Sequence, residues 1–152
     1  MNNSITIQSY PKINLALDIL TPNIAGYHAI TTVFHQQGEP FDEIILENQK
    51  GMCEVTCDNP LVPSDENNTA LKAAFLLKEK LADPTYGVKI KIAKKIPVRS
   101  GLGGGSSNAV AALKGLVKLW DVRCCGDQKK HEDPACMLRE IANTIGMDCA
   151  FF

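Results

Sequence analysis

Residues 100–107, SGLGGGSS, concentrate glycine and serine directly before a segment with a helical apolar pattern. The first N–H groups of a helix lack partners within the helix, and together with the helix dipole they attract an anion. Glycine reaches backbone conformations closed to other residues, so successive N–H groups can surround phosphate oxygens. The serine hydroxyls would add contacts to phosphate or to a magnesium ion. The stretch therefore predicts a phosphate-binding loop.

This loop differs from the two most familiar phosphate-binding patterns. It matches neither GxxxxGK[ST] nor a strict GxGxxG. A flexible loop that is capped by serine and binds nothing stays open as an alternative. Basic residues precede the loop without an intervening acid, and they either attract the same anion or form a solvated strand face: Lys89, Lys91, Lys94, Lys95 and Arg99.

Lys12, Asn14 and Asp148 are polar residues in or next to predicted elements. Lys12 and Asn14 lie two residues apart in an alternating segment, so both side chains project from the same face of a strand. Asp148 follows Gly146 at the exit of a predicted helix. Taken singly, Lys12 is typical of a solvated strand end and Asp148 of a turn, so each needs support from the rest of the sequence.

Alternating apolar residues predict the strands that position these groups. Ile13, Leu15, Leu17 and Ile19 occupy every second position, which is the pattern of a strand with one face buried. Alternation or enrichment in β-branched and aromatic residues predicts further strands at 29–35, 41–47, 53–57 and 87–95.

Apolar residues at three- and four-residue spacings predict the helices. The first covers 70–81, and the second begins near Ser106. The third has Asp133 as its N-cap and Pro134 in its first turn, and it stops at Gly146. Because several strands precede a helix, a strand and two helices, we predict an α+β fold with the helices on one face of a mixed or antiparallel sheet.

Size and charge limit the class of protein. With 152 residues, of which 45% are apolar and 22% charged, one packed domain is expected. A net charge of −1 gives no global attraction for nucleic acid or for an anionic membrane. The N-terminus has no secretion signal and the apolar runs are too short to span a bilayer, so a cytoplasmic location is expected.

The six cysteines contain no CxxC pair, and without a secretion signal free thiols are expected. A zinc site would have to combine Cys124, Cys125, His131 and Cys136. Adjacent cysteines rarely face the same ion, so we predict no metal-ligating residues.

Four motifs, in this order and at these separations, resemble those of the GHMP small-molecule kinases: PKINLALDIL, GYHAITTVFHQ, PVRSGLGGGSSNAV and IGMDCAFF. The resemblance runs from about Tyr10 to Phe152. The glycine loop identifies the superfamily, and the lysine-asparagine strand together with GYH singles out the branch that acts on a cytidine-diphosphate methylerythritol. Members of this family are nearly twice as long, so the resemblance implies that 1–152 is one amino-terminal domain without its carboxy-terminal partner domain.

The resemblance also implies an activity and its residues. It implies ATP- and Mg²⁺-dependent phosphorylation of the 2-hydroxyl of 4-diphosphocytidyl-2-C-methyl-D-erythritol, in the non-mevalonate isoprenoid pathway. Asp148 would take the proton from that hydroxyl, and Lys12 would hold the hydroxyl in place. Asn14 would bind the substrate, while Tyr27 and His28 would recognise its cytidine. The implied ATP-binding residues are Asn68, Lys94, Pro97, Gly101, Leu102, Gly103, Gly104, Gly105, Ser106, Ser107 and Asn108.

Other functions stay open from the sequence. A GHMP kinase for a different small alcohol is possible in principle, although GYH argues against it. A second alternative is a nucleotide-binding module without turnover, because the family's second domain is absent. A nucleic-acid module fits poorly, since the total charge is near neutral and aromatic residues are scarce in the basic stretch. The oligomeric state is open.

Overall fold

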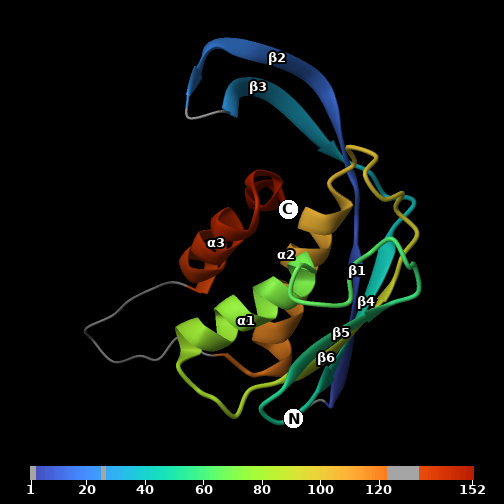
Figure 1. Ribbon diagram of the computed structural model, residues 1–152, viewed down its shortest axis with the longest axis vertical. Helices are drawn as coiled ribbons and strands as arrows, with labels where there is room; N and C mark the ends of the chain where they lie inside the picture. Colours follow the sequence, from blue (N-terminus) through green and yellow to red (C-terminus); the bar gives the residue numbers. More distant parts are fainter. Residues whose placement is uncertain (1–2, 25–26, 123–133) are drawn as a thin grey trace.

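The protein has an α+β fold, as predicted (Figure 1). The structure, a computed structural model, describes residues 3–24, 27–122 and 134–152, and within these ranges the side chains at 20–24, 27–29 and 134 lie outside the description. The elements in chain order are β1 (Ser4–Ser9), β2 (Lys12–Ile24), β3 (Tyr27–Gln36), β4 (Asp42–Asn48), β5 (Cys53–Cys57), α1 (Thr69–Leu81), β6 (Val88–Ala93), α2 (Gly104–Leu119), α3 (Pro134–Ile145) and the 3-10 helix η1 (Met147–Phe151).

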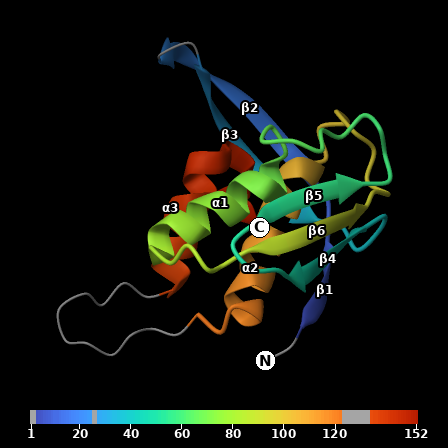
Figure 2. The same cartoon turned by 60° about the horizontal axis from the view of Figure 1, so that its bottom comes forward.

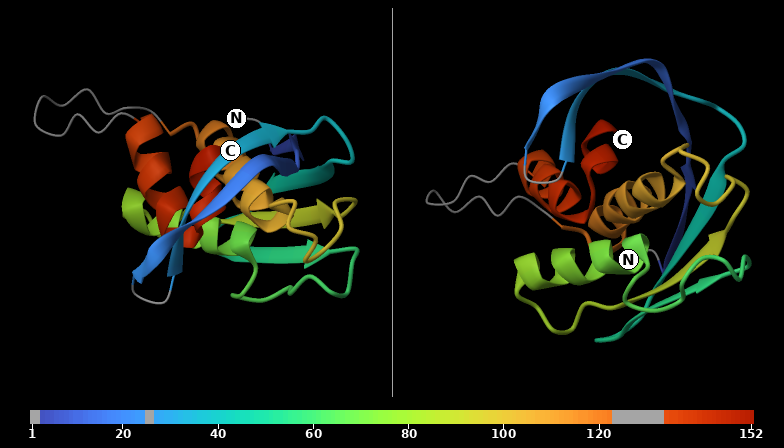
Figure 3. Two further views of the ribbon diagram at one scale, coloured as in Figure 1. Left: turned by 90° about the horizontal axis from the view of Figure 1, so that it is seen from above. Right: turned by 45° about the horizontal axis from the view of Figure 1, so that its top comes forward.

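The main sheet is mixed, and its strand order is β1-β4-β6-β5. β4 pairs antiparallel with β1 and β6, whereas β5 runs parallel to β6. Parallel neighbours need a crossover connection, and α1 supplies it between β5 and β6. Figures 2 and 3 show α1 and α2 against one face of this sheet. This arrangement confirms the prediction that helices cover one face.

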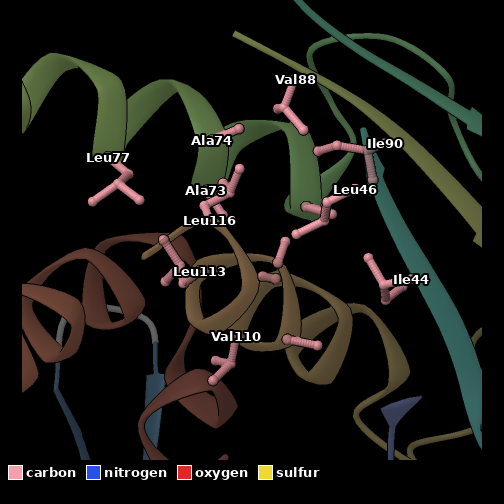
Figure 4. Packing of buried hydrophobic residues seen from close by; sticks show 14 of the residues in the cluster. Ile44, Leu46, Ala73, Ala74, Leu77, Val88, Ile90, Val110, Leu113 and Leu116 are labelled. Carbon is pink, nitrogen blue, oxygen red and sulfur yellow. The ribbon is translucent and has the colours of Figure 1, made fainter. Parts of the chain in front are cut away.

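The core lies between this sheet face and the helices (Figure 4). Every second residue of β6 is buried, while Lys89 and Lys91 lie on the opposite face and pair with Glu54 and Glu47. The basic strand is therefore a solvated face with acidic partners. The buried residues labelled in Figure 4 are Ile44, Leu46, Ala73, Ala74, Leu77, Val88, Ile90, Val110, Leu113 and Leu116.

β1 was absent from the predicted strands. Its sequence alternates Ile5 and Ile7 with polar residues, and both side chains pack against the core. The period-two signal was present, but it is short and lies at the start of the chain. Pairing with β4 stabilises this terminal strand.

The prediction of a buried face on the strand at 13–19 is wrong. Leu15, Leu17 and Ile19 are 61%, 54% and 58% exposed. The reason is tertiary: β2 pairs with β3 in a separate two-stranded hairpin, which leaves the body and arches over η1 (Figures 1 and 3). The helix layer that covers the main sheet does not extend over these side chains.

A β-bulge also changes which side chains of β2 share a face. Asn14 pairs with Phe34 and Ala16 with Val33, so Leu15 is an extra residue on β2. Directly paired residues lie on the same face of a sheet, and the alternation therefore shifts by one position after Leu15. Beyond the bulge, the odd-numbered apolar residues lie on the face that carries Lys12 and Asn14.

The helices begin and end near their predicted residues. α2 begins at Gly104 rather than near Ser106, because Gly103 adopts a left-handed conformation, φ 69°, at the N-cap. α3 begins at Pro134 and ends before Gly146 as predicted, whereas the predicted cap Asp133 lies outside the described residues. In the described part of the chain, no helix is both long and apolar enough to cross a bilayer.

Candidate active site

The glycine loop joins β6 to α2 next to the point where the hairpin leaves the body (Figure 1). Gly101 and Gly103 have positive φ angles of 77° and 69°, which other residues rarely adopt. The N–H of Lys12, the first residue of β2, donates to the carbonyl oxygen of Leu102 at 2.9 Å. This hydrogen bond fixes the loop against the base of the hairpin.

The start of α2 presents backbone donors. Gly103 has no side chain to cap the helix, and the first intrahelical bond runs from the N–H of Ser107 to the carbonyl oxygen of Gly103 at 2.9 Å. The N–H groups of Gly104, Gly105 and Ser106 therefore have no partner within the helix. This geometry suits an anion with several oxygens.

A pocket of about 440 Å³ opens at this helix start. It is lined by every predicted ATP-binding residue except Ser107, and by Asp148. A Cβ on Gly104 would lie 3.1 Å from both Ile96 Cγ2 and Lys94 Nζ, which is closer than an ordinary van der Waals contact. The first residue of α2 thus lies close against Lys94 and Ile96.

Ser107 is turned away from the pocket. Its side chain is buried, and its Oγ lies 2.7 Å from Ser9 Oγ at the end of β1. The same Ser9 hydroxyl lies 2.7 Å from Oδ1 of Asn108, which is also buried but reaches the pocket lining. In this structure the Ser107 hydroxyl therefore ties α2 to the sheet.

Asn68 and Lys94 line the pocket with polar groups that already have partners. Asn68 caps α1, since its Oδ1 accepts from the N–H of Ala70 at 2.9 Å and its Nδ2 donates to the carbonyl oxygen of Pro63 at 2.8 Å. Lys94 Nζ lies 2.7 Å from Oδ2 of Asp42. Both side chains shape the pocket wall as well as lining it.

The two predicted catalytic residues lie together although they come from opposite ends of the chain. Lys12 Nζ is 3.4 Å from Asp148 Oδ2 and donates to Asn14 Oδ1 at 2.8 Å. The same ammonium lies 4.8 Å from the centre of the Phe34 ring. The Lys12 side chain is 7% exposed and that of Asp148 35%, so the carboxylate is the member of the pair that is open to solvent.

η1 holds Asp148 in place. Gly146 ends α3, and the buried Cys149 donates its N–H back to the carbonyl oxygen of Gly146 at 3.0 Å. Phe151 packs against Phe34 with ring centres 4.9 Å apart, which joins this turn to the hairpin. The turn that carries Asp148 is therefore held on both sides.

The predicted substrate residues are described only in part. Asn14 donates from Nδ2 to Thr32 Oγ1 at 2.8 Å, so its amide is fixed on the hairpin next to Lys12. Tyr27 and His28 begin β3, but their side chains lie outside the described residues. Their predicted contact with cytidine stays a prediction.

The structure adds residues that sequence reasoning missed. Thr69 Oγ1 donates to the carbonyl oxygen of Gly105 at 2.7 Å and lines the pocket. Asp42 is fully buried and binds Lys94. Phe34 packs under the Lys12 ammonium. Local sequence carried no signal for these partners, since each contact joins segments far apart in the chain.

Metal and thiol chemistry can be stated for the described residues. In those ranges no group of three or more His, Cys, Asp or Glu residues could hold a metal ion, and Cys124, Cys125 and His131 lie outside them. The four described cysteines are free thiols. Burial raises the pKa of the Cys149 thiol; a hydrogen bond with Ser106 opposes this rise, and the charge of Asp148 adds to it.

Comparisons with known proteins agree with this geometry. The sequence profile described as "GHMP kinases N terminal domain" matches residues 68–152. The 4-diphosphocytidyl-2-C-methyl-D-erythritol kinase of Acetivibrio thermocellus is 36% identical over 148 residues, which cover 97% of this chain and 48% of the relative. The enzyme of the same name from Caldicellulosiruptor bescii is 39% identical over 146 residues, 95% of this chain and 47% of the relative.

Solved structures give the same result. A crystal structure of 4-(cytidine 5'-diphospho)-2C-methyl-D-erythritol kinase aligns with a TM-score of 0.76 and 30% identity over 97% of this chain and 48% of that protein. Homoserine kinase from Cytophaga hutchinsonii shares the fold, with a TM-score of 0.63 and 21% identity over 95% of this chain and 42% of that one. This chain spans about half the length of the curated relatives it matches. The chain belongs to the GHMP kinases, and it matches their N-terminal domain.

Proposed function

We propose that this chain carries the ATP-binding and catalytic residues of an enzyme that transfers a phosphoryl group from ATP to an alcohol. The observation that carries this proposal is the position of the Lys12–Asp148 pair. Asp148 lines the same pocket as the free N–H groups at the start of α2. A carboxylate that could accept a proton and a helix start that could bind an anion thus line one cavity.

The pocket residues fit the phosphates of a nucleotide. The N–H groups of Gly104, Gly105 and Ser106 would bind phosphate oxygens, and the absence of side chains at the two glycines allows the close approach. Asn68, Lys94 and Pro97 would border the base and sugar. Mg²⁺, when bound with ATP, neutralises charge on the β- and γ-phosphates.

Asp148 and Lys12 would each act on the hydroxyl group of the alcohol. The Asp148 carboxylate would accept the proton of the attacking hydroxyl. Lys12 would donate to the hydroxyl oxygen and offset the negative charge that develops during transfer. The Asn14 amide and the Phe34 ring hold the Lys12 ammonium in this position before substrate arrives. Such prior positioning is what phosphoryl transfer requires from a protein.

The proposed acceptor is the 2-hydroxyl of 4-diphosphocytidyl-2-C-methyl-D-erythritol, which would place the reaction in the non-mevalonate isoprenoid pathway and in the cytoplasm. The names of the relatives that align over nearly the whole chain support this acceptor. Tyr27 and His28 would contact the cytidine from the hairpin. We propose that residues 1–152 act as one nucleotide-binding domain that also supplies the residues for transfer to this acceptor.

The test is ADP formation from ATP, Mg²⁺ and the cytidine-diphosphate methylerythritol, comparing the chain with Asp148→Asn. Glu140→Gln is a matched control, because it removes an exposed carboxylate of α3 that pairs with Lys80 and does not line the pocket. We expect ADP formation by the parent chain and by Glu140→Gln, and none above background by Asp148→Asn.

Two other outcomes distinguish the alternatives. Nucleotide binding without ADP formation would reject transfer by this chain alone and favour the nucleotide-binding module. ADP formation with homoserine but not with the cytidine compound would favour a different GHMP kinase. Full activity of Asp148→Asn would reject Asp148 as the proton acceptor.

A further inference from the structure

Asp42 is a fully buried carboxylate whose side-chain hydrogen bonds go to one short segment, residues 94–96. It is the first residue of β4 and is 0% exposed. Its Oδ1 accepts from the N–H groups of Lys95 and Ile96, both at 2.7 Å, and its Oδ2 accepts from Lys94 Nζ at 2.7 Å. A buried charge is tolerated only when it is paired and hydrogen-bonded in this way. The carboxylate therefore holds the backbone of Lys95 and Ile96 and the side chain of Lys94.

The segment 94–96 packs against the start of α2. Lys94 Nζ also donates to the carbonyl oxygen of Ile96 at 2.7 Å, so the ammonium is held within the segment 94–96. A Cβ on Gly104 would lie 3.1 Å from both Lys94 Nζ and Ile96 Cγ2. Gly104, the first residue of α2, thus lies against the side chains of Lys94 and Ile96, and Asp42 binds the ammonium of the first and the backbone N–H of the second.

We propose that Asp42 is a positioning residue for the phosphate site: by fixing Lys94 and Ile96 beneath Gly104, it sets where the free N–H groups of α2 lie. This inference rests on the proposed function, because it takes those N–H groups as the nucleotide-phosphate donors. Asp42 itself does not line the pocket. It acts through the segment 94–96, which it holds in place.

The competing interpretation is electrostatic, and it predicts that removing the charge of Asp42 changes nucleotide affinity in the opposite direction. If Lys94 bound phosphate directly as a mobile cation, Asp42 would compete with the nucleotide for the ammonium. Removing the charge of Asp42 would then release Lys94 and tighten nucleotide binding. If Asp42 positions the segment 94–96, the same change loosens that segment and weakens nucleotide binding.

Asp42→Asn separates these interpretations. An asparagine can still accept from the two backbone N–H groups through Oδ1, but its Nδ2 would face the Lys94 ammonium, donor against donor. Titration calorimetry with ADP is the binding measurement. We expect roughly tenfold weaker binding. Glu47→Gln is the matched control, since it removes the β4 carboxylate that pairs with the half-exposed Lys91, and its binding should be unchanged.

A double-mutant cycle tests whether Asp42 acts through Lys94. Lys94→Met removes the ammonium and keeps most of the side-chain volume. If the two residues form one unit, Asp42→Asn adds little to the loss already caused by Lys94→Met. Fully additive losses would overturn the proposed route through Lys94.

A measurement without nucleotide keeps the inference independent of the proposed function. NMR order parameters report backbone motion at individual amides. In Asp42→Asn we expect lower order at Gly104 and Gly105 and no change at Gly115, in the middle of α2. If the parent chain binds no ADP, the proposed function fails, and these order parameters still decide the inference. Should Asp42→Asn not fold, Lys94→Met serves for the same measurement. Unchanged order at Gly104, or tighter ADP binding, would overturn the inference.

Discussion

Lys12, the first residue of β2, and Asp148, in the C-terminal 3-10 helix, meet with 3.4 Å between Nζ and Oδ2. The glycine loop lies between them in the chain and joins them in space. The N–H of Lys12 donates to the carbonyl oxygen of Leu102, and a Cβ on Gly103 would lie 3.1 Å from the ring of Phe152. Three separate segments therefore depend on one another for their positions.

Lys12→Met should stop phosphoryl transfer and preserve nucleotide binding. The methionine keeps the buried stem, but it removes the ammonium that bridges Asn14 and Asp148. We expect kcat to fall by about 10² or more, as when a single transition-state donor is removed. The control is Lys95→Met, because Lys95 lies over the Phe41 ring at 5.0 Å in a similar cation–π contact outside the pocket lining. Equal losses in the two variants would contradict a special role for Lys12.

Ser107→Ala should reduce stability more than it reduces nucleotide binding. The buried Ser107 hydroxyl is hydrogen-bonded with Ser9, which keeps Asn108 Oδ1 as a partner, so the loss of this one bond should cost about 1 kcal/mol in the free energy of unfolding. Urea unfolding measures this cost, and calorimetry with ADP measures binding. Ser106→Ala provides the comparison, because Ser106 lines the pocket. A variant Ser107→Ala that folds normally and fails to bind ADP would show that this hydroxyl reaches the phosphates after all.

Leu17→Ala should barely change the free energy of unfolding. Leu17 is 54% exposed on the hairpin, so truncation leaves no cavity, and we expect a change within about 0.5 kcal/mol. Leu46→Ala, at a fully buried position of β4, should cost about 2–5 kcal/mol. Thermal and urea unfolding of both variants make the comparison. A large loss from Leu17→Ala would mean that another surface covers the hairpin in solution.

The Cys149 thiol should react slowly with iodoacetamide in mildly alkaline buffer. Burial raises its pKa, so little of the reactive thiolate is present, and each unit of such a rise lowers the thiolate fraction about tenfold. Peptide mass spectrometry should find Cys136, which is exposed, modified first, and the difference should vanish in urea. Faster labelling of Cys149 than of Cys136 in the folded chain would contradict this prediction.

The raised pKa of Cys149 also predicts the direction in which stability changes with pH. The folded chain favours the neutral Cys149 thiol, so this contribution is fully present below the pKa of the unfolded chain and is lost as the pH rises through the folded value. Cys53 and Cys57, whose pKa values are also raised by burial, act in the same direction. The free energy of unfolding should therefore decline on the alkaline side, and serine at these three positions should flatten the decline.

The sequence by itself determined the local elements and the kind of chemistry. Enrichment in β-branched and aromatic residues identified β4, and alternation identified β6. Three- and four-residue spacing identified α1 and α2, and the glycine-serine cluster located the helix start that lines the pocket. These signals are readable because period and backbone freedom are properties of neighbouring residues. The order of four motifs identified the GHMP kinase family, which the comparisons confirmed.

Only the tertiary structure decided which groups meet. The turn of Ser107 toward Ser9, the burial of Lys94 against Asp42 and the bulge at Leu15 each depend on pairing between distant segments. The exposed face of β2 has the same origin, because an alternating pattern states that a strand has an apolar face and not which layer covers it. Contacts between distant segments are chosen by the packing of the whole domain, so no local pattern encodes them.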